Sequence, residues 1–271
     1  MPVEPFFASV KELQFYLLAG AFALARMTGF MLLMPLFSRV PLSGLLRNGV
    51  ALALAVPVFP MIVNKLTNTD IATTMIVVYM FKEVVVGVTL GLAMGIPFWA
   101  AEAAGDILDL QRGSTMGTLI DPMMTHETSA TGTLLAVIMV TIYLAAGGLE
   151  LSLTSLYDSY GLWPIDQLLP VFSKDAAGIF LDLLNRILMM ALTLVFPLII
   201  SMLLSDIVLA FLARASPHLN VFALSLIVKT LVFSLVFVLY SAFLLFYMNR
   251  DLGFLNEAGR QIEAIGCRSC R

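Results

Sequence analysis

Long runs of Leu, Met, Ala and Phe dominate the chain, and short polar stretches separate them. A helix needs about 20 consecutive apolar residues to cross the hydrocarbon core of a bilayer. Six stretches are about that long or longer, at roughly residues 13–36, 45–63, 71–101, 131–153, 179–212 and 219–248. The pattern therefore predicts an all-α protein of the integral membrane type, built from about six long hydrophobic segments arranged as helical hairpins.

Prolines punctuate these segments, and several lie near segment ends, where a proline stops a helix. Pro197 instead lies in the middle of 179–212, so we expect it to kink that helix or divide it into two pieces. Some of the predicted segments should therefore be split by proline.

The composition agrees with a membrane protein. Of the 271 residues, 60% are hydrophobic and 12% are charged, and the mean hydropathy is +0.98; soluble domains carry about twice that charged fraction. The net charge of -3, with no basic stripe, excludes a nucleic-acid-binding protein.

The absence of linkers and convincing repeats predicts a single domain over 1–271. The first apolar run follows only Lys11 and resumes after Arg26, so we interpret it as a retained segment and not a signal peptide.

The distribution of Lys and Arg predicts the orientation of the C-terminus. In a six-pass model, one side carries Lys11, Lys65, Lys174, Arg250, Arg260, Arg268 and Arg271, and the other carries Arg39, Arg47, Arg112 and Arg214. The positive-inside rule then predicts a cytoplasmic C-terminus, with residues 249–271 as a cytosolic tail. Cys267 and Cys270 lie in this tail without the further ligands that zinc needs, which favours a reduced pair over a metal site.

Ionisable residues interrupt nearly every apolar segment. A charge at the centre of a bilayer costs roughly 2.5–3.5 kcal/mol even on lenient scales, so these side chains should not face lipid. Asp182 and Arg186 can pair along one helix face, whereas adjacent Lys82 and Glu83 should point apart and each need another element. Either the charges form an ion or proton pathway, or partner subunits supply their counter-charges; their scattered positions favour the second. The charges expected to be buried are Arg26, Lys82, Glu83, Glu102, Asp106, Asp182, Arg186, Asp206 and Lys229.

Gly87, Gly91 and Gly95 recur every four residues in the third segment, and such a stripe predicts close packing of another helix. Glu102, Asp106 and the acid at position 109 follow at helical spacing. They could bind a cation, although a hydrated rim or a face paired with basic residues is favoured. No nucleophile, base and orienting group suggest a catalytic site, so we expect neither an enzyme nor a cofactor.

Several separated motifs resemble the SctT family of type III secretion export-apparatus proteins, of which flagellar FliR is a relative. They are Glu102, Gly105 and Gln111-Arg112-Gly113, then Asp121-Pro122, Gly147-Gly148, LYDSYGLWP at 156–164, and RASPHLNVFALSLIVK at 214–229. Ser159, Tyr160, Trp163 and Pro164 are more similar to the virulence injectisome branch than to the flagellar one.

The resemblance implies a subunit of a helical export gate in the bacterial inner membrane. Its partners would be about five R-type (FliP-like) subunits, about four S-type (FliQ-like) subunits, a switch protein and a large export-gate protein. The N-terminal part would be R-subunit-like and the C-terminal part S-subunit-like. The gate would pass unfolded secreted proteins, driven by a cytosolic ATPase and the proton-motive force.

The resemblance also implies that a loop at about 109–123 plugs the central pore. The pore and plug residues would be Asp109, Gln111, Arg112, Gly113, Met116, Gly117, Asp121 and Pro122. Glycines let such a loop bend at low steric cost, and methionines fill irregular space. The alternative is a free-standing ion-coupled secondary transporter that uses Glu102, Asp106 and Lys82 as a coupling site.

Overall fold

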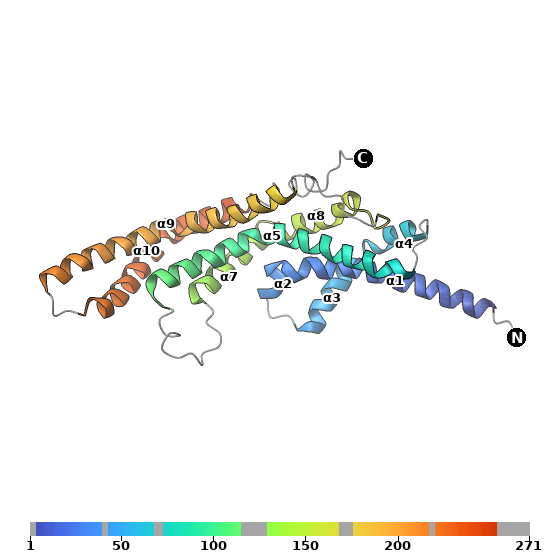
Figure 1. Ribbon diagram of the computed structural model, residues 1–271, viewed down its shortest axis with the longest axis horizontal. Helices are drawn as coiled ribbons and strands as arrows, with labels where there is room; N and C mark the ends of the chain where they lie inside the picture. The colour runs from blue at the N-terminus through green and yellow to red at the C-terminus, as the bar shows by residue number, and fades with distance from the viewer. Residues whose placement is uncertain are drawn as a thin grey trace. The chain divides into compact units, whose positions relative to one another are not determined.

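The described part of the chain is helical throughout and contains no strand. The computed structural model describes residues 4–39, 43–67, 73–114, 129–167, 176–216 and 220–253. Its helices are α1 (Glu4–Leu33), α2 (Pro35–Arg39), α3 (Gly44–Ala55), α4 (Phe59–Thr67), α5 (Ile76–Arg112), α7 (Ala130–Ala145), α8 (Gly148–Leu162), α9 (Ala176–Ala215) and α10 (Val221–Asp251), with a 3-10 turn at Thr73–Met75 before α5 (Figure 1). The all-α prediction is confirmed.

Four helices in the described ranges are long and apolar enough to cross a membrane: α1 over Glu12–Leu33, α5, α9 over Leu181–Ala215, and α10. Two further helix pairs pass the same test together but are bent, α3 with α4 by 60° and α7 with α8 by 75°. If each bent pair is one span, the number reaches 6. The six predicted segments therefore correspond to four continuous helices and two bent pairs.

A proline accounts for the bend between α3 and α4. Pro57 lies between the two helices and has no N–H with which to continue the helical ladder. The neighbouring N–H groups form shorter turns, with Val58 N–H donating to Ala55 O at 3.2 Å and Phe59 N–H donating to Val56 O at 3.3 Å. This segment is split by proline, as predicted.

The bend between α7 and α8 has a different cause, because glycine and not proline lies there. Gly147 has a φ of 74°, in the left-handed region that side chains other than glycine rarely adopt. Its N–H donates to Leu144 O at 3.2 Å, which closes the end of α7. The predicted segment at 131–153 is thus two helices, and the second continues to Leu162.

Of the two outcomes expected at Pro197, division of 179–212 is wrong, since α9 is one continuous helix that contains this proline, and a kink stays a prediction. A proline inside a helix removes one backbone hydrogen bond, and apolar membrane helices tolerate that loss where nearby groups compensate. Pro97 lies inside α5 in the same way.

The chain forms two compact units, each assembled from segments that are distant in sequence. The first contains Met1–Gly95, Leu149–Leu181 and Leu255–Arg271, and in it α1 packs against α3 and α4. The second contains Ile96–Gly148 and Asp182–Phe254, and in it α7 packs against α10. The single domain, with its R-like and S-like parts, stays a prediction.

Candidate functional site

The carboxylate of Asp109 joins the end of α5 to the beginning of α7, although Asp109 is only 2% exposed. Its Oδ1 accepts a hydrogen bond from the Thr131 hydroxyl at 2.6 Å and pairs with the Arg112 guanidinium. Its Oδ2 accepts from the Ser129 hydroxyl at 2.7 Å and from the Thr131 N–H at 3.1 Å. Donors therefore surround both oxygens, as a buried charge requires. We call Asp109, Arg112, Ser129 and Thr131 the loop base.

Both helix ends at the loop base are capped. Gly113 follows the end of α5 with a φ of 77°, which lets the N–H of Ser114 turn back and donate to Asp109 O at 3.1 Å. Ser129 is the N-cap of α7, where its hydroxyl oxygen accepts from the N–H of Gly132 at 2.8 Å. The same serine donates to Asp109, so capping of α7 and attachment to α5 use one side chain.

Two glycines allow α5 and α7 to approach closely near the loop base. A Cβ added at Gly105 would lie 2.3 Å from the Cα of Gly132. A Cβ added at Gly132 would lie 2.5 Å from Oδ1 of Asp106. Neither position has room for a side chain, so both glycines are needed for this packing.

Helix α10 also contacts the end of α5, and it is paired in turn with α9. Lys229 of α10 lies 2.7 Å from Oδ2 of Asp206 of α9, and its Nζ donates to the carbonyl of Gln111 at 3.3 Å. The Arg112 guanidinium lies 4.6 Å from the centroid of the Phe233 ring, within the range of a cation–π contact. A lysine beside the last carbonyls of a helix also complements its dipole. The end of α5 is therefore held from two directions.

Half of the predicted plug residues are described. Asp109, Gln111, Arg112 and Gly113 lie together at the end of α5, whereas Met116, Gly117, Asp121 and Pro122 lie outside the described residues. Sequence reasoning did not assign Ser129, Thr131 or Phe233 to this site. A serine directly before an apolar helical run is a recognisable N-cap signal, but nothing in the sequence pairs it with Asp109.

A second polar cluster lies inside the first unit, around Arg26 of α1. Arg26 is 0% exposed; its Nε donates to Oε2 of Glu83 at 2.7 Å, and its other nitrogens donate to the Ser159 hydroxyl at 2.9 Å and the Trp163 carbonyl at 2.8 Å. Its guanidinium also lies 3.7 Å from the centroid of the Tyr160 ring. The Ser-Tyr and Trp residues of the 156–164 motif therefore surround one buried arginine.

Lys82 belongs to the same cluster. Its Nζ lies 2.7 Å from Oε1 of Glu83 and donates to the carbonyls of Pro164 at 2.9 Å and Gln167 at 3.1 Å. The expectation that Lys82 and Glu83 point apart is wrong for their charged ends, because the flexible four-carbon stem of lysine lets its ammonium reach the neighbouring carboxylate. Glu83 is thus shared by two buried cations.

Gly87 and Gly91 of α5 lie against α1 within the first unit. A Cβ added at Gly87 would lie 2.1 Å from the carbonyl oxygen of Arg26, and one added at Gly91 would lie 2.5 Å from that of Phe30. Gly29 of α1 is equally close to α5, because a Cβ added there would lie 2.5 Å from the carbonyl oxygen of Val84. Gly95 is buried. These contacts bring the two backbones together around the Arg26 cluster.

The other charges expected to be buried are less enclosed in the single chain. Glu102, Arg186, Asp206 and Lys229 are half-buried, and Asp106 and Asp182 are exposed. Because the expectation concerns an assembly, their burial stays a prediction. No three His, Cys, Asp or Glu side chains in the described part of the chain are grouped to hold a metal ion.

The chain is similar to known bacterial export proteins over most of its length. A family model described as bacterial export proteins, family 1, matches residues 17–254. The chain is 36% identical over 226 residues to the Yop proteins translocation protein T of Yersinia pestis, which covers 83% of this chain and 86% of that protein. It is 31% identical over 236 residues to the surface presentation of antigens protein SpaR of Salmonella typhimurium, covering 87% of each.

A flagellar relative is also found. The flagellar biosynthetic protein FliR of Bacillus subtilis is 29% identical over 205 residues, which cover 75% of this chain and 78% of that protein. The matches extend over most of the chain, and the long apolar helices agree with an inner-membrane protein. The chain therefore belongs to the SctT/FliR family of type III secretion export-apparatus proteins.

Proposed function

We propose that this export-gate subunit forms part of the entry pore for unfolded secreted proteins and contributes a plug from the segment that follows α5. The observation that supports this most directly is the loop base. Asp109 at the end of α5 binds Ser129 and Thr131 at the beginning of α7, so one buried carboxylate fixes both ends of the segment between them. A plug needs fixed ends to return to the same place after each substrate.

The proposed partners are those that the family resemblance implies: R-type and S-type gate subunits, a switch protein and a large export-gate protein. Large apolar side chains exposed on α9 and α10 support partner or membrane contact. They include Phe196, Leu203, Phe211, Leu235, Val238 and Leu239. The proposed C-terminus is cytoplasmic, and the proposed role is non-enzymatic.

The contacts of Lys82 favour the gate over an ion-coupled transporter. A transporter that used Glu102, Asp106 and Lys82 would have to bring these side chains to one site. Lys82 instead contacts Glu83 and the carbonyls of Pro164 and Gln167, all within the first unit. The Lys82 ammonium is already paired within this cluster, so it is not available to the coupling site that a transporter would need.

Deleting residues 116–122 tests the plug, because it shortens the segment while leaving Gly113 and the loop base intact. Co-expressed with R-type and S-type subunits, the deletion variant should assemble with normal yield and let cells leak ions through the gate. The measurement is ion conductance of cells that carry the assembled gate. Unchanged conductance with normal assembly would contradict the plug.

Purification of the chain alone tests the gate against the transporter. The gate interpretation predicts a protein that is stable only when co-expressed with its partner subunits. A monodisperse single chain that transports a small solute in liposomes would overturn it.

A further inference from the structure

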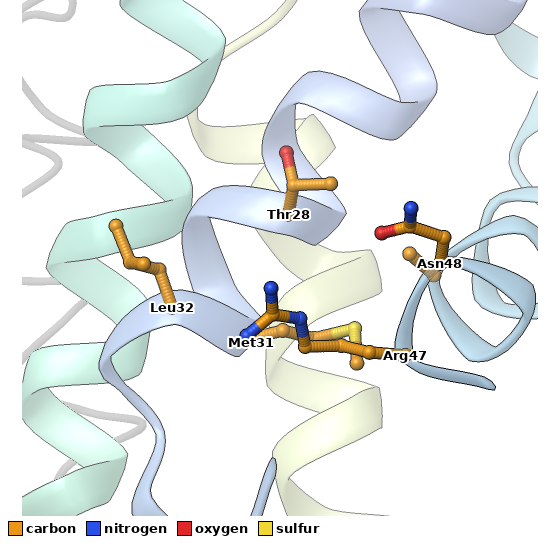
Figure 2. Close-up of a pocket in the computed structure, with 6 residues that line it drawn as sticks. Thr28, Met31, Leu32, Arg47 and Asn48 are labelled. Atoms are coloured by element: carbon orange, nitrogen blue, oxygen red, sulfur yellow. The ribbon is translucent and has the colours of Figure 1, made fainter. Parts of the chain in front are cut away.

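A pocket of about 130 Å³ lies between α1 and α3, within the first unit. Thr28, Met31 and Leu32 line it from α1, and Arg47, Asn48 and Ala51 line it from α3 (Figure 2). Met31 and Ala51 are almost fully buried and provide an apolar floor, while Leu32 is 65% exposed at the rim. The pocket therefore combines an apolar interior with polar side chains at its opening.

The polar side chains at the rim are available for a ligand. Among the described residues, the side chains of Arg47 and Asn48 have no hydrogen-bond or ion-pair partner. Figure 2 shows the Arg47 side chain extending from α3 towards α1, beside Met31. A guanidinium offers five N–H donors and a primary amide offers two, so this rim is rich in donors and matches a group with several acceptor oxygens.

Helix α3 also exposes large apolar side chains. Leu45 is 84% exposed, Leu46 58% and Leu52 57%, all on the same helix as Arg47. Arg47 lies in the first turn of α3, at the start of the bent pair that is apolar enough to enter a membrane. Arginine near the end of such a helix typically extends its charge to the level of the lipid head groups, with its stem along apolar surface.

We propose that this pocket binds the phosphate of an anionic phospholipid. Arg47 and Asn48 would donate to its phosphate oxygens, and Leu32 at the rim would contact its acyl chains. The proposal rests on the membrane location of the family and not on the plug.

The number of donors does not separate a phosphate from a carboxylate of a partner subunit. The two oxygens of a carboxylate can accept from both Arg47 and Asn48, as those of Asp109 accept from four donors. A phospholipid is favoured because it also carries acyl chains, which suit exposed Leu32 at the rim and the start of a helix pair that is apolar enough to enter a membrane.

Native mass spectrometry of the complex purified in detergent tests the site, with phosphatidylglycerol and phosphatidylcholine as probes. Both lipids carry the phosphate, but the choline cation of phosphatidylcholine would lie near the positive charge of Arg47. The wild type should therefore retain phosphatidylglycerol in preference to phosphatidylcholine. R47Q should lower retention by about five-fold or more, which corresponds to loss of a charge-assisted pair, and N48A should lower it less. R214Q is the matched control, because Arg214 is also exposed and lies in the last turn of α9. It should behave as wild type.

Four outcomes would overturn the proposal. R47Q and R214Q could retain the lipid equally, or phosphatidylcholine could be retained as well as phosphatidylglycerol. Inorganic phosphate could displace the lipid, which would indicate a free-anion site. R47Q could instead lose partner subunits while keeping the lipid, which would indicate a protein contact. Since Arg47 and Asn48 are exposed, we expect both variants to keep the thermal midpoint of the wild type.

Discussion

Thr131 binds both oxygens of Asp109, with its hydroxyl 2.6 Å from Oδ1 and its N–H 3.1 Å from Oδ2. The two residues are 22 positions apart in the chain. This contact holds the end of α5 and the beginning of α7 together, and so fixes the two ends of the segment between them.

Asp109→Asn should weaken the loop base. The amide carries no charge for Arg112 and puts a donor where two oxygens now accept, so we expect a loss of about 1.5–3 kcal/mol in the free energy of unfolding. The denaturation midpoint of the co-purified complex in detergent measures it. Asp106→Asn is the control, since Asp106 lies one turn earlier on α5 and is exposed. Equal losses in the two variants would contradict a specific role for Asp109.

Arg26 and Glu83 should behave as a coupled pair. Removing one partner leaves a buried charge uncompensated, which typically costs about 3–5 kcal/mol. We therefore expect R26A and E83A each to be strongly destabilising, and the double variant to lose less than their sum. The thermal midpoints of the wild type, R26A, E83A and the double variant form a double-mutant cycle. Strict additivity of the two single losses would refute the coupling.

R26K separates charge from geometry in the same cluster. Lysine keeps the charge but cannot reach Glu83, Ser159 and the Trp163 carbonyl with one planar fork, so R26K should also be destabilising. R250K is the matched control because the Arg250 side chain is 56% exposed. It should have little effect.

Substitutions at Gly147 test the bend between α7 and α8. A Cβ at this position meets no atom within 4 Å, so any cost comes from the positive φ alone. Gly147→Ala should cost about 1 kcal/mol and Gly147→Val more, whereas Gly147→Asn should be milder because asparagine tolerates this region. Gly161→Ala, where a Cβ also meets nothing within 4 Å, should be neutral or stabilising. A midpoint for Gly147→Val equal to that of Gly161→Ala would argue against backbone strain at the bend.

Hydropathy was sufficient to locate the helices, because a long apolar run in this composition has few alternatives to a helix. It did not distinguish a straight helix from a bent pair. Pro57 marks one bend in the sequence, but Pro197 is the same residue type within a continuous helix. The difference lies in whether the neighbouring turns keep their backbone hydrogen bonds, which a single residue does not determine.

The site was less predictable than the fold. The sequence identified Asp109, Gln111, Arg112 and Gly113 through a resemblance, and it identified Arg26 and Glu83 through the cost of charges in apolar segments. It could not pair Asp109 with Thr131 or Arg26 with Ser159, because hydrogen bonds between distant segments follow from packing. Local spacing carries no information about such partners.

The close approach of Gly87 to Arg26 also has a mechanical meaning. The backbone of Arg26 rests on Gly87 while its side chain holds Glu83, one turn earlier on α5. Sliding α1 along α5 would move the Arg26 backbone off the glycine that accommodates it and pull the ion pair apart in the same movement. A backbone contact and an ion pair therefore oppose the same displacement of the two helices.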